Sequence, residues 1–290
     1  HFIGIGGIGM SAIAIALIKK GFSVSGSDVI QNDQTNKIKA LGAIIFDMQG
    51  GENIDLIQKK YSNKEVIIVK SIAIQKDNKE LVYSIKQNLS VKHRSEILSL
   101  IMQTYNSIGI AGSHGKTSTS TFLSTLLALC TKNTSSIIGG IQPIYNSNSH
   151  IEKTKFMVAE IDESDGSTCN YKSDLGIITN IDFDHADYFS DLNEVILTFK
   201  KFAANSKKSL INNDCQISLE NISFSYKWSI KTIKNIDFSM IPKELNESNT
   251  IADYYERGKY IDTFNIPIPG LHNLSNITAA ISACRLNDVS

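Results

Sequence analysis

The sequence has little arginine and no excess of charge of either sign. Arginine occurs only at Arg94, Arg257 and Arg285 among the 290 residues, and Lys plus Arg and Asp plus Glu both number 29. Nucleic-acid-binding domains carry clustered basic side chains that neutralise phosphates, so this balance argues against such a partner. We therefore expect neither DNA nor RNA to bind.

Cysteine is also scarce, and long apolar runs are missing. The four cysteines lie far apart without metal-ligand spacing, so we expect reduced thiols in a cytoplasmic protein. Apolar runs such as residues 8–18 are interrupted by glycine or serine, and no leader with a cleavage site precedes them, which predicts no membrane partner. Both ends of the chain fall inside strand-like or helix-like runs, so we expect them to be trimmed. The oligomeric state stays open.

Apolar residues are plentiful enough for two ordinary cores, at 42% of 290 residues. Strand-like runs alternate with helical patterns from residue 2 onward, which is typical of an α/β fold with a parallel sheet. A polar turn at residues 106–107 marks a domain boundary. We predict a Rossmann-like parallel-sheet domain at residues 1–106 and a P-loop α/β central domain at residues 107–290. Short β-like runs at residues 223–268 predict an antiparallel extension of the second sheet.

The segment Gly112-Ser-His-Gly-Lys-Thr117 lies between a strand pattern and a helical pattern. A strand that leads at once into a helix directs backbone N–H groups at one spot, where phosphate oxygens fit. Lys116 would neutralise the β- and γ-phosphates of ATP, and the Thr117 hydroxyl would ligate the bridging Mg²⁺. Ile110 replaces the first glycine of the generic pattern, so we predict a shortened loop. The alternative is a glycine turn with an incidental lysine.

A second glycine-rich segment, Gly4-Ile-Gly-Gly-Ile-Gly9, follows a strand pattern and opens a helical one. Its glycines would let a pyrophosphate approach the helix N-terminus, and Asp28 could accept a bond from a ribose hydroxyl or a base N–H. Alone, the pattern fits NAD, a UDP-sugar or an empty tight turn. A ligase that uses ATP on a nucleotide-linked substrate needs both phosphate sites, so the pair favours a ligase.

Acidic residues gather at the end of the strand pattern at residues 156–159. Glu160 stands where an open α/β sheet presents its ligand groups, and a carboxylate oxygen suits Mg²⁺. Asp162, Glu163 and Asp165 follow in the next loop. We interpret these three as a solvated acidic turn.

His185 follows the strand pattern at residues 175–180 and would face the same edge of the sheet. A lone histidine is more often structural than a metal ligand, and imidazole is softer than Mg²⁺ prefers. His272, Asn273 and Asn276 open the last helical pattern. There an imidazole could stack on adenine and amides could pair with its edge, but helix capping is an even alternative for Asn273.

Taken together, these motifs resemble the Mur ligases of peptidoglycan synthesis. The two glycine loops and three later motifs occur in the family's order: Val158-Ala-Glu-Ile-Asp-Glu-Ser-Asp165, Thr179-Asn-Ile-Asp-Phe-Asp-His185 and Pro269-Gly-Leu-His-Asn-Leu-Ser-Asn276. The resemblance implies an ATP-dependent ligase that joins L-alanine to the carboxylate of UDP-N-acetylmuramate through an acyl phosphate. The family also has a C-terminal domain that binds the amino acid. We expect no counterpart of that domain within these 290 residues, and therefore no turnover from them alone.

The resemblance also implies the site residues. Catalysis is expected of Lys116, Glu160 and His185, and Mg²⁺ binding of Thr117, Glu160 and His185. ATP contacts are expected from Gly112, Ser113, His114, Gly115, Lys116, Thr117, Ser118, His272, Asn273 and Asn276. UDP-sugar contacts are expected from Gly4, Gly6, Gly7, Gly9, Met10, Ser27, Asp28, Ser71 and Arg94. The chain departs from the family's pattern at residues 70–74, 77–80 and 91–96.

Three other functions stay open from the sequence. A sibling Mur ligase attaches a recycled tripeptide to the same UDP-sugar, but residues 6–10 favour the alanine ligase. An NAD-dependent oxidoreductase would use only the first glycine loop and leave residues 112–117 without a role. A non-catalytic UDP-sugar-binding protein that uses ATP as a switch would use both.

Overall fold

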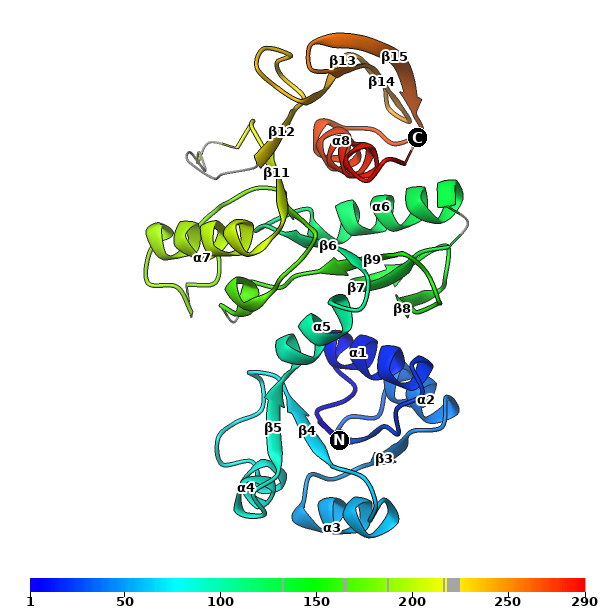
Figure 1. Cartoon of the computed structure of the whole chain (residues 1–290), viewed down its shortest axis with the longest axis vertical. Coiled ribbons are helices and arrows are strands. Elements are labelled where there is room, and N and C mark those ends of the chain that lie inside the picture. The colour runs from blue at the N-terminus through cyan, green and yellow to red at the C-terminus, as the bar shows by residue number, and fades with distance from the viewer. Residues whose placement is uncertain (132, 164–165, 187, 216, 218–224, 290) are drawn as a thin grey trace. The chain divides into compact units, whose positions relative to one another are not determined.

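The computed structural model describes residues 1–131, 133–163, 166–186, 188–215, 217 and 225–289, and it contains two compact units (Figure 1). The first unit comprises residues 1–101 and 137–152, and the second comprises residues 102–136 and 153–290. Each unit is an α/β structure, as the sequence predicts. The boundary expected after residue 106 stays a prediction.

Five parallel strands form the sheet of the first unit, in the order β3-β2-β1-β4-β5. They are β1 (Phe2–Ile3), β2 (Ser25–Ser27), β3 (Ile44–Phe46), β4 (Ile67–Lys70) and β5 (Ser90–His93). The strand order reverses between β1 and β4, and open α/β sheets bind ligands outside the carboxyl ends of the strands at such a point. The loops that leave β1 and β4 carry Gly4 and Ser71, two residues of the predicted UDP-sugar site.

Five helices accompany this sheet along the chain: α1 (Ile8–Lys19), α2 (Asp33–Ala40), α3 (Gly51–Lys60), α4 (Lys79–Lys86) and α5 (Arg94–Met102). Helix α1 is buried all along residues 10–16, which fits its nearly continuous apolar sequence. Asn32 and Thr35 begin α2 with a reciprocal capping box. One core cluster packs α3 and α4 against the central strands β1 and β4. It consists of Ile3, Ile54, Ile68 and Leu81.

Within the described residues, the second sheet has ten strands in the order β15-β14-β13-β12-β11-β10-β6-β9-β7-β8. They are β6 (Asn106–Ala111), β7 (Ser135–Gln142), β8 (Ser147–His150), β9 (Phe156–Glu160), β10 (Leu175–Ile178), β11 (Lys208–Asn212), β12 (Ser225–Ser229), β13 (Phe238–Leu245), β14 (Thr250–Glu256) and β15 (Lys259–Ile266). Strands β13, β14 and β15 pair antiparallel, which confirms the predicted extension.

The extension begins later than the sequence indicates. Strand β12 pairs parallel with both β11 and β13, and its Trp228 is only 1% exposed. A strand buried between parallel neighbours belongs to the central sheet, so the prediction of antiparallel pairing was wrong for β12. Residues 223–224, where the predicted run starts, lie outside the described residues.

The described part of the second unit also contains three α-helices and one short 3₁₀ helix: α6 (Lys116–Thr131), η1 (Ser167–Asn170), α7 (Leu192–Asn205) and α8 (Leu271–Leu286). Helices α6 and α8 pack on one another, and α8 also contacts β12 and β13 (Figure 1). Their apolar faces share one core with the sheet, including Leu123, Leu127, Trp228 and Ala279. No helix in the described part of the chain is long and apolar enough to cross a membrane.

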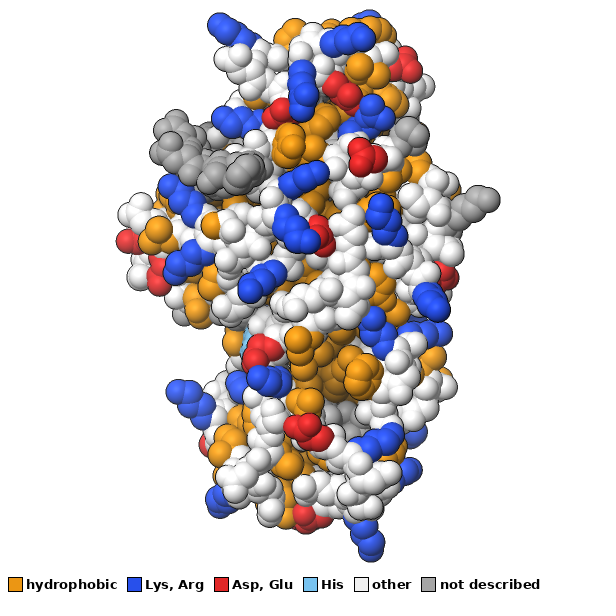
Figure 2. All heavy atoms as spheres, in the orientation of Figure 1, with side chains coloured by type: hydrophobic (Ala, Val, Ile, Leu, Met, Phe, Trp, Pro, Cys, Tyr) orange, Lys and Arg blue, Asp and Glu red, His pale blue; other side chains and the backbone are white. Residues whose placement is uncertain are grey.

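The surface agrees with the balanced composition. On the face shown in Figure 2, Lys and Arg side chains are scattered among acidic, polar and apolar ones and do not form one basic patch. All four cysteines are free thiols, with Cys284 buried and Cys130 exposed.

Candidate active site

The predicted phosphate loop joins the end of β6 to the start of α6, and two of its glycines are required by its shape. Gly112 and Gly115 have φ values of +135° and +81°, in the left-handed region that side chains disfavour. A Cβ on Gly112 would lie 2.1 Å from Thr179 Oγ1, and one on Gly115 would lie 2.6 Å from Asn276 Oδ1. The loop therefore owes its close packing to glycine.

The segment that follows β10 fixes this loop from one side. Ser113 N–H donates to the Asn180 carbonyl oxygen (3.3 Å), and His114 N–H donates to Asn180 Oδ1 (2.8 Å). Thr179 Oγ1 in turn donates to the His114 carbonyl oxygen (2.7 Å). Two loop N–H groups that we expected to be free for phosphate are therefore engaged. The N–H groups of the first turn of α6 have no acceptor within the helix and point outward from its start.

Lys116 is held by three acceptors in this structure. Its Nζ lies 2.7 Å from the Gly112 carbonyl oxygen, 3.2 Å from that of Ser113 and 2.8 Å from Glu163 Oε1. An ammonium group has three donors, so the Lys116 side chain is saturated by the protein. A phosphate would have to replace at least one of these partners.

Glu163 is a candidate functional residue whose role the sequence pattern does not indicate. We interpreted it as part of a solvated acidic turn, but its residue is 2% exposed and its carboxylate faces Lys116, so that interpretation was wrong for Glu163. Burial raises the pKa of this carboxyl, and Lys116 opposes the increase. Asp162 is half-buried, and Asp165 lies outside the described residues. The sequence gives no signal for this burial, because residues 156–159 of β9 are all buried and show no two-residue alternation that Glu163 could continue.

The Glu163 carboxylate also lies close to the His185 side chain. His185 Nε2 lies 3.4 Å from Glu163 Oε1, and His185 has a left-handed backbone with φ of +57°. Non-glycine residues at positive φ are uncommon and gather at functional sites. Two of the predicted catalytic residues, Lys116 and His185, therefore meet at Glu163.

Two predicted metal ligands also meet. Thr117 Oγ1 donates to Glu160 Oε1 at 2.9 Å, with Thr117 exposed and Glu160 half-buried at the end of β9. Among the described residues, no group of three or more His, Cys, Asp and Glu side chains forms a candidate metal site. Mg²⁺ needs no such group, because it commonly uses one or two protein oxygens with waters and substrate phosphates.

The start of α8 contributes one close neighbour of the loop. Asn276 lies against Gly115, and its Oδ1 accepts a bond from Thr119 Oγ1 (3.2 Å). Asn273 Nδ2 donates to the Pro269 carbonyl oxygen (2.8 Å), and His272 is exposed. Helix α8 begins at Leu271 with Gly270 as a cap that has no side chain, so Asn273 does not cap this helix.

In the first unit, the predicted UDP-sugar loop is also tightly packed. Gly6 N–H donates to Asp28 Oδ2 (2.7 Å), and a Cβ on Gly6 would lie 2.9 Å from both Asp28 and Thr35. The next glycine residue and Ile8 are exposed at the start of α1. The loop thus presents a helix N-terminus to solvent at the carboxyl edge of the sheet.

The remaining predicted residues of this loop differ in accessibility. A Cβ on Gly9 would lie 3.1 Å from Arg94 Nη1, so Arg94 reaches the first turn of α1. Met10 and Ser27 are buried, and the Ser27 hydroxyl donates to Glu80. Arg94 is thus well placed to bind an anion at this helix start. Ser27, in contrast, is buried and its hydroxyl is engaged by Glu80.

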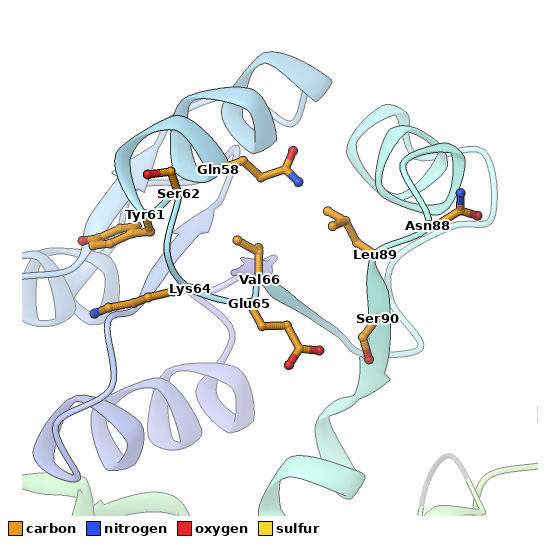
Figure 3. A pocket seen from close by; sticks show the side chains of 9 residues that line it. All are labelled: Gln58, Tyr61, Ser62, Lys64, Glu65, Val66, Asn88, Leu89 and Ser90. Carbon is orange, nitrogen blue, oxygen red and sulfur yellow. The ribbon is translucent and has the colours of Figure 1, made fainter.

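A separate pocket in the first unit lies away from this edge. It has a volume of about 270 Å³ and is lined by Gln58, Tyr61, Ser62, Lys64, Glu65, Val66, Asn88, Leu89 and Ser90 (Figure 3). These residues precede or begin β4 and β5, so the pocket lies at the amino ends of the strands. Ligands of open α/β sheets bind at the opposite edge, and this pocket is not the predicted UDP-sugar site.

The fold and both loops define a protein with two nucleotide-type α/β units, the second built around a phosphate loop. Comparison with known families gives the particular class. The model for the Mur ligase family catalytic domain matches residues 1–106, and the model for the Mur ligase middle domain matches residues 110–284. The chain belongs to the Mur ligase family.

Curated relatives are similar over the whole chain. A protein named UDP-N-acetylmuramate--L-alanine ligase from Prochlorococcus marinus subsp. pastoris is 62% identical over 290 residues, covering 100% of this chain and 61% of that protein. A protein of the same name from Synechococcus sp. (strain CC9311) is 42% identical over 289 residues and is covered to 60%. The chain therefore spans about three fifths of the length of these relatives.

Solved structures share the fold at lower identity. UDP-N-acetylmuramate-alanine ligase MurC from Thermotoga maritima has a TM-score of 0.84 at 22% identity, over 100% of this chain and 65% of that one. A UDP-N-acetylmuramate:L-alanyl-gamma-D-glutamyl-meso-diaminopimelate ligase from Neisseria meningitides has a TM-score of 0.87 at 23% identity, over 100% of this chain and 93% of that one. At these identities the likeness concerns the fold.

Proposed function

We propose that this chain is part of an ATP-dependent ligase that joins L-alanine to the carboxylate of UDP-N-acetylmuramate, in the synthesis of peptidoglycan precursors. The observation that carries the proposal is the 62% identity, over all 290 residues, to a protein with that name. The two phosphate-type loops support it, because this reaction needs one nucleotide site for the UDP-sugar and one for ATP. The use of ATP and the free cysteines accord with a cytoplasmic reaction.

The chemistry proceeds in two steps. A carboxylate oxygen of the UDP-sugar attacks the γ-phosphorus of ATP, so that ADP leaves and an acyl phosphate forms. The amine of L-alanine then attacks the acyl carbon, phosphate leaves, and the nitrogen loses a proton. Positioning and charge neutralisation dominate such phosphoryl transfers. We assign these tasks to Lys116, to the first turn of α6 and to the loop glycines Gly112 and Gly115.

Mg²⁺ fits beside these residues. Thr117 Oγ1 and Glu160 Oε1 lie 2.9 Å apart, which matches the separation of about 2.9 Å between adjacent ligands of an octahedral Mg²⁺ with bonds of 2.0–2.1 Å. When bound, the ion would neutralise phosphate charge. We propose Thr117 and Glu160 as its protein ligands. His185, beside Glu163, is the candidate for a second metal contact.

The sibling activity is the second candidate. The solved tripeptide ligase from Neisseria meningitides and the solved alanine ligase from Thermotoga maritima have similar TM-scores, 0.87 and 0.84, so the fold does not separate the two activities. Names of curated relatives at 39–62% identity favour L-alanine. Two ligation assays decide between these activities, one with L-alanine and one with the tripeptide. Both need a protein as long as the relatives, of which this chain spans about three fifths.

The direct test of the ATP site is the Lys116→Ala substitution in a protein as long as the relatives. We expect this variant to lose ATP-dependent ligation while it still binds UDP-N-acetylmuramate, because Lys116 belongs to the second unit. Lys201→Ala, an exposed lysine on α7, is the matched control and should keep full activity. Unchanged turnover of Lys116→Ala would overturn the assignment, and ATP hydrolysis by the unaltered protein without amide formation would favour a nucleotide switch instead.

A further inference from the structure

Residues 137–152 belong to the first unit, although the middle-domain family model covers them. They contain most of β7 and all of β8, and β8 lies beside helix α1. Lys37 Nζ on α2 also donates to the Asn146 carbonyl oxygen in the turn between these strands (2.9 Å). A segment distant in sequence therefore completes the surroundings of the predicted UDP-sugar loop.

Asn148 makes the central contact of this segment. Its residue is 0% exposed, and its Nδ2 donates to the Ile8 carbonyl oxygen (2.9 Å) and to Ser11 Oγ (3.2 Å). Ser11 Oγ itself donates to the Ile8 carbonyl oxygen (2.8 Å). The three groups form a closed set of hydrogen bonds on the first turn of α1.

Within the described residues, the first turn of α1 lacks the usual hydrogen bond from an N-cap side chain. Gly7 is the N-cap of α1, and it makes no side-chain cap hydrogen bond. Helix starts usually rely on a Ser, Thr, Asp or Asn cap, which is worth roughly 1 kcal/mol. Here an amide from β8 restrains the turn instead, while Gly7 and Ile8 at the helix start are exposed.

The carbonyl oxygen of the Asn148 side chain could accept a further hydrogen bond. Asn148 Oδ1 is buried and has no hydrogen-bond partner within the described ranges. A buried unsatisfied acceptor costs about 1–3 kcal/mol, and a hydroxyl or N–H donor on a bound ligand would remove that cost. This atom sits on the residue that restrains the anion-binding helix start.

We infer that Asn148 is a positioning residue for the UDP-sugar, holding the start of α1 in the conformation that receives the diphosphate. The inference rests on the proposed function of the first unit. It assigns to β8 a part in binding the sugar nucleotide, although this strand lies between the phosphate loop and Glu160 in the sequence. ATP binding should not depend on Asn148.

Calorimetric titration of this chain with UDP-N-acetylmuramate tests the inference on Asn148→Ala and Asn148→Leu. We expect both variants to bind the UDP-sugar about tenfold more weakly, with ATP affinity unchanged. Asn148→Leu keeps the branching at Cγ and the number of side-chain heavy atoms but removes the unsatisfied acceptor, while Ser11 Oγ still donates to the Ile8 carbonyl oxygen. Its melting temperature should therefore equal or exceed that of the unaltered chain, which a merely structural role of Asn148 would not allow.

Ser149→Ala is the matched control, because Ser149 is buried on the same strand and its Oγ has no partner in the described part of the chain. It should bind the UDP-sugar as the unaltered chain does. Unchanged affinity in Asn148→Leu, or equal losses for ATP and the UDP-sugar, would overturn the inference. Failure of the unaltered chain to bind the UDP-sugar would contradict the proposed function itself, so the two failures are distinguishable.

Discussion

At the scale of single residues, the ion pair between Lys116 and Glu163 is expected to weaken ATP binding. The ammonium must exchange a carboxylate at 2.8 Å for phosphate oxygens. Glu163→Gln removes the negative charge but keeps the shape, so Lys116 is easier to release. We predict that Glu163→Gln lowers the Kd for ATP several-fold in an equilibrium titration.

Asp162→Asn is the control for this prediction, since it removes the same charge from a half-buried neighbour. It should change the Kd for ATP less than Glu163→Gln does. Weaker ATP binding in Glu163→Gln would show that the carboxylate arranges the phosphate site, and that Lys116 does not simply exchange partners.

Two glycines with nearly equal positive φ values allow backbone strain to be distinguished from steric crowding. Gly115 and Gly258 have φ of +81° and +79°, but a Cβ on Gly115 would meet Asn276 Oδ1 at 2.6 Å, whereas a Cβ on Gly258 would meet nothing within 4 Å. Alanine at either position costs about 1–2 kcal/mol of backbone strain. We predict that Gly115→Ala lowers the stability further and weakens ATP binding, while Gly258→Ala affects stability alone. Equal effects in urea unfolding and ATP titration would contradict this.

At the scale of elements, Asp174 links the amino ends of three neighbouring strands. Its carboxylate accepts bonds from Ser107 N–H of β6 (2.9 Å) and from Lys207 Nζ just before β11 (2.6 Å), and Asp174 itself precedes β10. Burial raises the pKa of Asp174, but the bonds from Lys207 and Ser107 outweigh burial and lower it below the ordinary value.

A lowered pKa in the folded state means that the carboxylate stabilises the fold above its unfolded pKa of about 3.9, and that this stability is lost as the pH falls through the folded pKa. We predict that Asp174→Asn melts at a lower temperature than the unaltered chain at pH 7. The difference should shrink as the pH falls from about 5 to 3. Glu247→Gln, in an exposed turn, is the control. A difference that does not depend on pH would contradict the account.

The sequence predicts those elements whose cause is local. The glycines at residues 4–9 and 112–115 indicate strand-to-helix turns, because Gly4, Gly112 and Gly115 have positive φ values and a Cβ on Gly6 would lie 2.9 Å from Asp28 and Thr35. A local sequence pattern does not reveal strand pairing with distant partners. The parallel pairing of β12, for example, is defined by its two neighbours in the sheet, β11 and β13. Burial of Glu163 depends on Lys116, 47 positions away, and Asn148 reaches Ser11 across 137 positions. No periodicity within either segment reveals those contacts.

At the scale of the whole molecule, each unit carries one predicted nucleotide site. Hydrogen exchange should therefore respond to the two ligands separately. We predict that UDP-N-acetylmuramate slows exchange at residues 4–11 and that ATP with Mg²⁺ slows it at residues 112–119, because ligands protect the backbone groups that they order. Protection of residues 4–11 by ATP alone would contradict the assignment of sites.

Whether the first unit binds the UDP-sugar is the most direct question, because a Rossmann-like loop fits NAD as well. Calorimetric titration of this chain with UDP-N-acetylmuramate and, separately, with NAD, at matched salt and with Mg²⁺ present, answers it. We predict heat of binding with UDP-N-acetylmuramate and none with NAD. Binding of NAD alone would contradict the proposed ligase.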